Sequence, residues 1–251
     1  MEIIFIGTGN SFVDPERGMS CCAIRADDGY ILVDAGSGSV HGCLQAGIGI
    51  ADVRGVLLTH FHLDHVLDLA QLLWLRRLHR SALAAPLRLV GPGGTMRLFE
   101  AIGATFSHSL ASHQSWTEVE EVPPGGRFEI CGIHGEAFKS LHTDESLCYR
   151  VEREGRVAAF SGDSGPCDGL AAACREADAA VLECSFGGPS PVEVHMGPAE
   201  CGRIGTMSGA KRLILTHLPD STGPAALALN VREARYAGEV TVAQDFMEIE
   251  I

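Results

Sequence analysis

Residues 57–68 read LLTHFHLDHVLD, in which an apolar strand end is followed by a cluster of ionisable side chains. His60, His62, Asp64 and His65 fall within six consecutive positions. Imidazole nitrogens and carboxylate oxygens are common ligands of zinc and other transition metals, and ordinary core packing does not require such a cluster. The stretch therefore predicts a metal site immediately after a strand.

Around this stretch, short runs rich in Ile, Val and Phe alternate with glycine turns and helical patterns. Runs that are apolar throughout are typical of strands covered on both faces. We predict strands at 3–6, 30–33, 56–59, 87–90, 157–160, 179–182 and 212–216, and helices near 65–80, 94–104, 167–177, 198–208 and 224–236. Residues 117–153 favour an antiparallel section, and the closing VTVAQDFMEIEI favours a strand. The alternation predicts an α/β protein with helices outside extended sheets, formed by 1–251 as a single domain.

The composition predicts a soluble protein of the cytoplasm. Apolar residues make up 46% of the chain, yet no stretch approaches the roughly 20 apolar residues that span a membrane. The N-terminal MEIIFIGTGN is typical of a strand and not of a signal peptide. Nine cysteines without a CxxC pair favour reduced, mostly buried thiols. We therefore expect no membrane partner.

Histidine and aspartate recur where the predicted strands end. VLLT is followed by His60, AAFSG by Asp163 and LILT by His217, while His142 closes the run EAFKSL. Open α/β folds form their sites at the carboxyl ends of strands, where the loops converge. The pattern predicts that these side chains meet at one edge of the fold.

The number of candidate ligands favours two ions over one. A tetrahedral ion accepts four ligands and leaves one position open in catalysis. His60, His62 and His142 suffice for one ion, and Asp64, His65 and His217 for a second. Asp163 has two carboxylate oxygens and is placed to bridge a pair of ions about 3.5–4 Å apart.

The same residues carry a resemblance to a known family. THFHLDH resembles the HxHxDH signature of the metallo-β-lactamase fold superfamily. IFIGTGNSFVDPERGMS, ILVDAGSG, HTDESLCYRVE, AFSGDSGP, HMGPAE, LILTHL and VREARY with VTVAQDFMEIEI are similar, in that order, to its ribonuclease Z-like branch. The resemblance implies a four-layer αβ/βα sandwich, a dinuclear site that usually holds zinc, with Mn or Fe as alternatives, and a homodimer.

The resemblance also implies roles for individual residues. It assigns the seven ligands to the two ions as above, Asp34 to the orientation of a ligand histidine, and His195 to proton donation. Bound zinc lowers the pKa of its water to about 7, so a metal-bound hydroxide would attack phosphorus while His195 protonates the leaving oxygen. Asp64 and His195 are thus the predicted catalytic residues, and Glu200 is a weaker candidate for support around His195.

Several alternatives stay open at this point. His134 competes with His142, which we prefer because Cys148-Tyr149-Arg150 follows where the family has Gly-Tyr-Arg. HMGPAE also reads as a plain loop leading into a helix, and GTGNS as a simple turn. Asp68 is expected to support a ligand or to be solvated. His41, His79, His108 and His113 lack partners at ligand spacing.

The predicted enzyme is a metal-dependent phosphodiesterase that acts on small phosphodiesters or short nucleotides. A net charge of −13 opposes general affinity for nucleic acid. Ribonuclease Z enzymes carry a tRNA-gripping arm between the motifs matching His142 and Asp163, but these residues are only 21 positions apart here. A lactonase or thioesterase of the same superfamily is the main alternative. A true tRNA 3′-processing endonuclease and a non-catalytic metal-binding protein are disfavoured.

Overall fold

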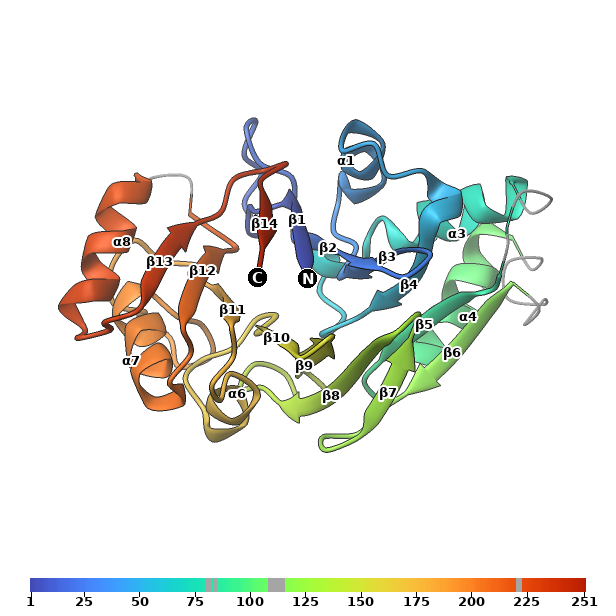
Figure 1. Cartoon of the computed structure of the whole chain (residues 1–251). Coiled ribbons are helices and arrows are strands. Elements are labelled where there is room, and N and C mark those ends of the chain that lie inside the picture. The colour runs from blue at the N-terminus through green and yellow to red at the C-terminus, as the bar shows by residue number, and fades with distance from the viewer. Residues whose placement is uncertain (80–82, 84, 108–115, 220–222) are drawn as a thin grey trace.

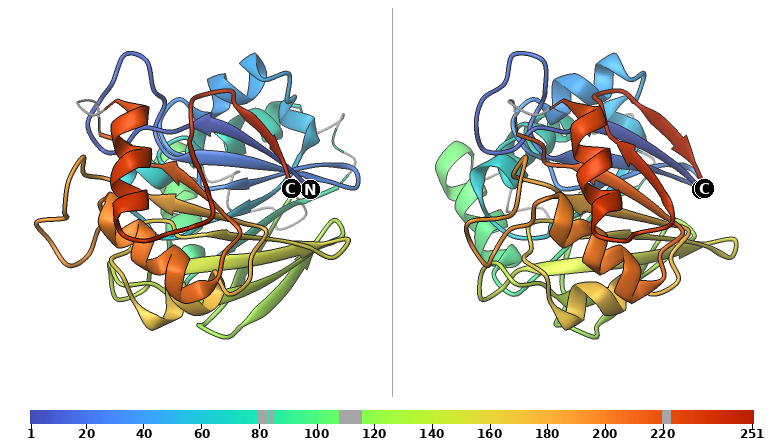
Figure 2. Two further views of the ribbon diagram at one scale, coloured as in Figure 1. Left: turned by 60° about the vertical axis from the view of Figure 1, so that its left-hand side comes forward. Right: turned by 90° about the vertical axis from the view of Figure 1, so that its left-hand side faces the viewer.

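The computed structural model describes residues 1–79, 83, 85–107, 116–219 and 223–251. Over these residues the strands form two seven-stranded sheets that face each other, with helices on both outer sides (Figure 1). The predicted four-layer αβ/βα sandwich is therefore confirmed. Figure 2 shows the layers from two further directions.

The first sheet has the order β14-β1-β2-β3-β4-β5-β6. Its strands are β1 (Glu2–Gly7), β2 (Cys21–Ala26), β3 (Gly29–Val33), β4 (Val53–Leu57), β5 (Leu87–Gly91), β6 (Thr117–Glu121) and β14 (Glu248–Glu250). Strands β3 to β6 run parallel, whereas β14, β1, β2 and β3 pair antiparallel. The carboxyl ends of β1, β3, β4 and β5 therefore lie at one edge of the sheet.

The second sheet has the order β13-β12-β11-β10-β9-β8-β7. Its strands are β7 (Arg127–Ile130), β8 (Ile133–Lys139), β9 (Leu147–Arg153), β10 (Arg156–Phe160), β11 (Ala179–Glu183), β12 (Arg212–Thr216) and β13 (Glu239–Val242). Strands β10 to β13 are parallel, and β7 to β10 are antiparallel. The strands β8, β10, β11 and β12 consequently end at the same edge.

Apolar side chains fill three layers of the sandwich. One cluster lies between the sheets and contains Phe5, Ile31, Tyr149 and Ile214. A second packs the first sheet against α1 (Ser39–Gln45), α2 (Leu63–Val66), α3 (Leu69–Leu78) and α4 (Thr95–Phe106). A third packs the second sheet against α6 (Asp168–Ala173), α7 (Pro198–Ser208) and α8 (Pro224–Glu233). Burial on both faces explains why the central strands are apolar throughout.

All seven predicted strands are present, and two further parts of the prediction are confirmed only in part. In 117–153, β6 pairs parallel with β5 in the first sheet, and only β7 to β9 form an antiparallel section. The closing segment contains two strands, β13 and β14, which belong to different sheets because the chain turns at Asp245 and Phe246 between them. The strand β2 and the helix α1 were not predicted.

The predicted helix 65–80 is divided into α2 and α3, and residue 80 lies outside the described residues. The division has a local cause. Ala35 donates its N–H to the carbonyl of His65 at 2.7 Å and accepts the N–H of Asp68 at 3.0 Å. These backbone groups are therefore not free to continue one helix, and the segment that carries Asp64 and His65 is held against the chain after β3.

The two ends of the chain lie side by side (Figures 1 and 2), and the Met1 amino group donates to the carbonyl of Ile251 at 2.8 Å. No helix within the described ranges is long and apolar enough to cross a membrane. All nine cysteines are free thiols, and seven of them are buried. Whether 1–251 acts as one domain and where the protein resides stay predictions.

Candidate metal centre

Seven side chains from both halves of the sandwich meet at the edge where the strands end. His60 and His62 follow β4, Asp64 and His65 lie in α2, and His142, Asp163 and His217 follow β8, β10 and β12. The two halves are joined just beneath this edge, since the Tyr149 hydroxyl donates to the Leu58 carbonyl and Leu147 N–H to the Thr59 carbonyl. The structure thus brings together every residue that the sequence predicts as a ligand; the ligand role itself stays a prediction.

The seven residues divide into two groups that share one member. His60, His62, His142 and Asp163 form the first group, and Asp64, His65, His217 and Asp163 the second; within each group the ligand atoms lie within 4.8 Å of one another. This is the division expected from the sequence. The second group is entirely buried, whereas His62 of the first group is exposed. Solvent and substrate would therefore reach the centre from the side of the first group.

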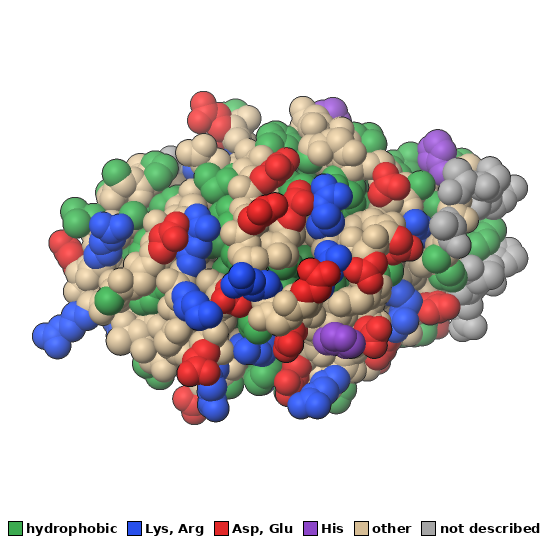
Figure 3. Space-filling model, viewed as in Figure 1, with side chains coloured by type: hydrophobic (Ala, Val, Ile, Leu, Met, Phe, Trp, Pro, Cys, Tyr) green, Lys and Arg blue, Asp and Glu red, His purple; other side chains and the backbone are tan. Residues whose placement is uncertain are grey.

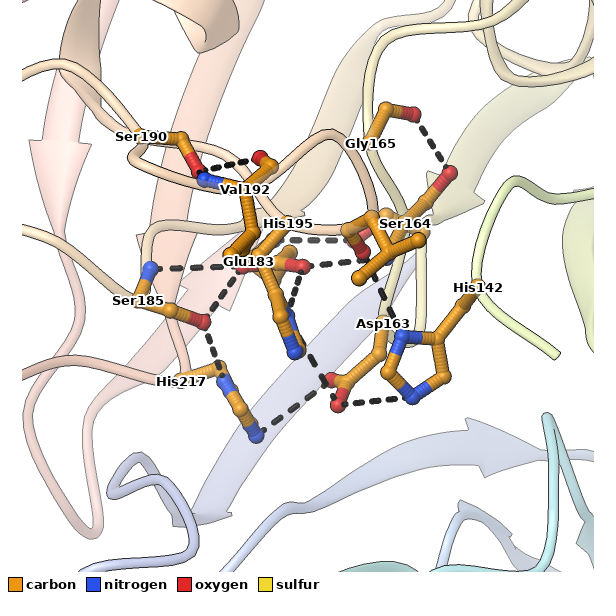
Figure 4. A network of polar contacts seen from close by, with 12 residues as sticks. His142, Asp163, Ser164, Gly165, Glu183, Ser185, Ser190, Val192, His195 and His217 are labelled. Atoms are coloured by element: carbon orange, nitrogen blue, oxygen red, sulfur yellow. Dashed lines mark hydrogen bonds and ion pairs between the residues drawn. The ribbon is translucent and has the colours of Figure 1, made fainter.

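Asp163 lies between the two groups and turns one oxygen to each. Its Oδ1 is 3.2 Å from His65 Nε2 and 3.3 Å from His217 Nε2. Its Oδ2 is 3.7 Å from the Nε2 atoms of both His60 and His142. Figure 4 shows this carboxylate with His142 and His217 on either side of it. The arrangement is the one a bridging carboxylate requires.

Two carboxylates behind the site orient the histidine rings. Asp34 Oδ2 accepts the Nδ1–H of His65 at 2.7 Å and the Thr59 hydroxyl at 2.8 Å. Because the Thr59 proton is used in this way, Thr59 Oγ1 accepts the Nδ1–H of His60, at 3.0 Å. Asp34 therefore fixes two rings with their Nε2 lone pairs toward the centre, which is how outer carboxylates commonly support metal ligands.

Glu183, at the end of β11, supports the other half of the site (Figure 4). It accepts the Ser185 hydroxyl, and Ser185 Oγ in turn accepts the Nδ1–H of His217 at 2.9 Å. Its Oε1 accepts the Nδ1–H of His195 at 2.7 Å and the N–H of Ser164 at 3.0 Å. Although Glu183, Asp163 and His195 could form a third group, the three donors to its carboxylate leave Glu183 in a supporting role.

The donor set fits divalent cations. Among the described residues, His60 Nε2 and Asp163 Oδ1 are buried without a hydrogen-bond partner. His62 Nδ1 and His142 Nε2 are 2.9 Å apart, and His65 Nε2 and His217 Nε2 are 3.4 Å apart. Paired imidazole nitrogens with lone pairs facing each other repel unless a proton or a cation lies between them. Imidazole and carboxylate ligands suit zinc, manganese and iron.

Histidine pKa values are shifted in opposite directions in the two groups. Burial, and then the nearby His65, lower the pKa of His60 to about 2, and burial lowers the pKa of His142. Burial alone would also lower the pKa of His65 and His217, but the Asp163 carboxylate raises both. Because the pKa of both rings is raised, protons compete with a cation for the second group more than for the first.

His195 lies beside the two groups and belongs to neither of them. Its ring centroid is 4.7 Å from that of His142, and its Nδ1 is 4.0 Å from Asp163 Oδ2. The side chain is 22% exposed. Burial is the largest influence and lowers the pKa of His195, but the hydrogen bond and charge of Glu183, together with the Asp163 and Asp64 carboxylates, outweigh it and raise the pKa above the ordinary value for imidazole. The ring is placed to hold a proton next to the candidate metal centre.

The remaining sequence candidates lie outside the centre. Glu200 does not contact His195; its Oε2 accepts the N–H groups of Gly197 and Ser190 and so holds both ends of the loop that carries His195. Asp68 accepts the N–H of Val40. The alternative His134 is exposed and 3.6 Å from Glu129. His41 and His79 belong to no ligand group, and His108 and His113 lie outside the described residues.

Sequence reasoning missed Glu183, Thr59 and Ser185. Glu183 closes the apolar run AAVLE, so the strand-end criterion that found His60 could have found it as well. Thr59 and Ser185 have no such signal. Each hydroxyl acts through a partner that is distant in the sequence, Asp34 for Thr59 and His217 for Ser185. The expected orientation of a ligand by Asp34 is present as a 2.7 Å contact to His65.

Comparison with known proteins identifies the family. The family model described as the beta-lactamase superfamily domain matches residues 30–218, which contain all seven candidate ligands. The chain belongs to the beta-lactamase superfamily. Its metallo-β-lactamase fold and its likeness to ribonuclease Z proteins, both predicted from the sequence, are confirmed.

Relatives and solved structures match over the full length of this superfamily member. A protein named ribonuclease Z from Mycobacterium bovis is 28% identical, covering 100% of this chain and 98% of that protein. The metallo-beta-lactamase fold protein YhfI from Bacillus subtilis superposes with a TM-score of 0.87 at 21% identity, covering 100% of this chain and 99% of that one. For the short form of human tRNase Z the TM-score is 0.79 at 25% identity, with the same coverage. The chain is accordingly a metal-dependent hydrolase of this superfamily.

Proposed function

We propose that the protein is a dinuclear metal-dependent phosphodiesterase that acts on small phosphodiesters, with zinc as the metal. His60, His62 and His142 hold one ion, Asp64, His65 and His217 hold the other, and Asp163 bridges them. The observation that carries the proposal is the position of His195, which Glu183 holds beside both groups and outside either one. A metal centre alone does not identify a reaction. A proton donor beside it favours reactions whose leaving group must be protonated.

The bound ions and the side chains would contribute different parts of the reaction. When bound, two divalent cations activate a water molecule and offset negative charge on the phosphoryl oxygens. Asp34 and Glu183 keep the ring nitrogens aimed at the centre. Glu183 accepts the Nδ1–H of His195 and raises the pKa of that ring, so that Nε2 keeps a proton to higher pH than in an ordinary imidazole. His195 then donates this proton to the departing oxygen, as a general acid.

The His195–Glu183 pair favours an oxygen leaving group over sulfur. An alkoxide is strongly basic and departs poorly unless it is protonated. A thiol has a pKa of about 8.5, so a thiolate departs with much less need of an acid. A phosphodiesterase therefore uses this pair more fully than a thioesterase would. A lactonase, which also releases an oxygen, remains the candidate to be separated by experiment.

The size and charge of the protein favour a small substrate. Between His142 and Asp163 the chain forms β9, β10 and a tight turn between them, which leaves no residues for a tRNA-binding arm in that segment. The net charge is −13, and Figure 3 shows acidic and basic side chains interspersed over the face it presents. A polynucleotide gains affinity mainly from clustered Lys and Arg. Although relatives are named ribonuclease Z, we therefore favour a short phosphodiester over precursor tRNA.

A substrate panel tests the proposal. The zinc-loaded protein is assayed with bis(p-nitrophenyl) phosphate, a homoserine lactone and a thioester. We expect turnover of the phosphodiester, and we expect His195→Ala to lower the turnover of a cyclic nucleotide, whose leaving oxygen is an alkoxide, by about 10²- to 10⁴-fold without loss of bound metal. Turnover of the lactone or the thioester alone would overturn the assignment. Association into a homodimer and residence in the cytoplasm stay predictions, which sedimentation and fractionation can check.

A further inference from the structure

The loop of residues 8–18, called here the Ser11 loop, connects β1 to β2 and contains most of the GTGNS stretch. The loop closes on itself, because Gly9 N–H donates to the Gly18 carbonyl at 2.8 Å. A Cβ at Gly7 would lie 2.0 Å from the Met19 carbonyl oxygen, so glycine is required where the returning chain passes. The glycines of this stretch therefore serve a close approach of two chain segments, which explains their presence without a phosphate-binding role.

A single distant carboxylate holds both ends of the Ser11 loop. Asp245 Oδ1 accepts the N–H of Thr8 at 2.9 Å and the Thr8 hydroxyl at 2.6 Å. Asp245 Oδ2 accepts the N–H of Gly18 at 2.6 Å. Hydrogen bonds to an ionised carboxylate are stronger than those between neutral groups. The ends of the loop are thus fixed to the segment between β13 and β14.

The fixed loop contacts two of the three segments that supply the second ligand group. Beside His217, Leu218 N–H donates to the Thr8 carbonyl at 2.8 Å. At the other end of the group, the Ser11 hydroxyl donates to Asp64 Oδ2 at 2.7 Å. The same Oδ2 is 3.2 Å from His217 Nε2 and is therefore the oxygen that faces the second group. The first ligand group has no equivalent contact from this loop among the described hydrogen bonds.

We infer that Ser11 is a positioning residue that fixes Asp64 as a ligand of the second ion, and that Asp245 acts through the loop to place Ser11. A carboxylate oxygen has two lone pairs. The Ser11 hydroxyl occupies one of them, which fixes the direction of the other toward the space between Asp64 and His217. Without the hydroxyl, the carboxylate can rotate or offer its other oxygen. The inference concerns the metal centre alone and does not depend on which bond the enzyme cleaves.

Metal titration of the apoprotein tests the inference. Protein stripped with a chelator is titrated with Co²⁺, and binding is followed through the visible absorption bands of the metal. We expect Ser11→Ala to weaken one of the two binding steps by about 10-fold, the lower end of what the loss of an outer partner does to metal affinity. The other step and the melting temperature of the apoprotein should be unchanged, since the Ser11 side chain is on the surface.

Matched variants separate positioning from a general effect on the fold. Ser11→Thr keeps the hydroxyl and should restore the affinity. Ser208→Ala removes a hydroxyl that bonds, among the described residues, only to the backbone of Gly205 and Ala210, and should leave both steps unchanged. Asp245→Asn should weaken the same step as Ser11→Ala, and the double variant should be no weaker than the worse single one, because coupled residues are not additive.

The inference is overturned if Ser11→Ala binds both ions within twofold of the wild type. It is also overturned if Ser11→Thr is as weak as Ser11→Ala, or if both steps weaken together with a lower melting temperature. A wild-type protein that binds no Co²⁺ would overturn the metal centre and this inference with it. A protein that binds Co²⁺ as expected but hydrolyses no phosphodiester would overturn only the proposed function.

Discussion

Asp34, which follows β3 in the first sheet, and Glu183, which ends β11 in the second, each orient two imidazole rings. Asp34 contacts His65 directly and His60 through Thr59. Glu183 contacts His195 directly and His217 through Ser185. Both halves therefore use one carboxylate and one hydroxyl to set two rings. The difference lies in what the rings do, because Asp34 supports two candidate ligands whereas Glu183 supports one candidate ligand and the candidate proton donor.

The backbone conformation is also similar at one strand end in each half. Asp34, directly after β3, and His217, directly after β12, both have positive φ values, of 62° and 55°. Side chains other than glycine adopt this region rarely, and such residues gather at functional sites where the surrounding structure holds them. Each half thus turns sharply at its strand end and directs a functional side chain into the site. The comparison predicts that the first half governs metal retention and the second half governs both retention and turnover.

The largest expected effect comes from Asp163, which both halves share. Asp163→Ala should reduce bound metal to at most one ion per chain and phosphodiester turnover to background, because both oxygens face ligand groups. Metal analysis and the bis(p-nitrophenyl) phosphate assay check this. Asp178→Ala, which removes a carboxylate bonded to Lys211 at the opposite end of the strands, is the control and should keep both properties. Full activity of Asp163→Ala would refute the shared role.

The second-largest expected effect comes from Asp34 and Glu183, and it should differ between these two carboxylates. Asp34→Asn should weaken metal binding by about 10- to 100-fold and lower turnover only as far as metal is lost, so that excess Zn²⁺ restores the rate. Glu183→Gln should lower kcat in a way that excess Zn²⁺ does not restore, since His195 loses the partner that holds its proton. Metal titration and kcat at saturating Zn²⁺ distinguish the two. If excess Zn²⁺ restored the kcat of both variants equally, the two carboxylates would not differ in function.

The dependence of kcat on pH also distinguishes Asp34→Asn from Glu183→Gln. The Glu183 carboxylate raises the pKa of His195, so the protonated ring that donates to the leaving group persists to higher pH and is lost as the pH rises through that pKa. Glu183→Gln should therefore move the alkaline limb of the kcat profile to lower pH, whereas Asp34→Asn should leave it in place. A limb that does not move in Glu183→Gln would exclude His195 as the proton donor.

The smallest effect concerns the two hydroxyls. Thr59→Val and Ser185→Ala each interrupt one relay from a carboxylate to a ring, to His60 and His217 respectively. We expect each to weaken metal binding by about 10-fold or less, because the ring keeps its place through packing. Thr59→Ser and Ser185→Thr keep the hydroxyl and should behave as the wild type. A larger loss in either conservative variant would point to packing and not to the hydrogen bond.

The ligand residues were predictable from the sequence because they are unusual types at recognisable positions. His60, Asp163 and His217 each follow an apolar run, and parallel strands bring their carboxyl ends to one edge. His142 was separable from His134 only through the resemblance around Tyr149. The grouping into two sets could be stated because His60 and His62 precede the start of α2, whereas Asp64 and His65 lie within it.

The supporting residues were not predictable in the same way. Ser11 and Asp245 are 53 and 181 positions from Asp64, and serine and aspartate are common in turns. Their roles depend on where the sheets place the loops, which no local pattern encodes. The break between α2 and α3 has a similar origin, since it results from the pairing of the backbone with Ala35. Local patterns thus predict the strands and the ligands, and tertiary contacts decide what orients them.

The proposed function requires a dinuclear centre with His195 outside it. The most direct test is the metal content of purified wild type and His195→Ala, measured by elemental analysis beside their turnover of a cyclic nucleotide, whose leaving oxygen is an alkoxide. We predict close to two transition-metal ions per chain in both proteins, with turnover lowered only in His195→Ala. One ion or none in the wild type, or loss of metal on substitution of His195, would contradict the account.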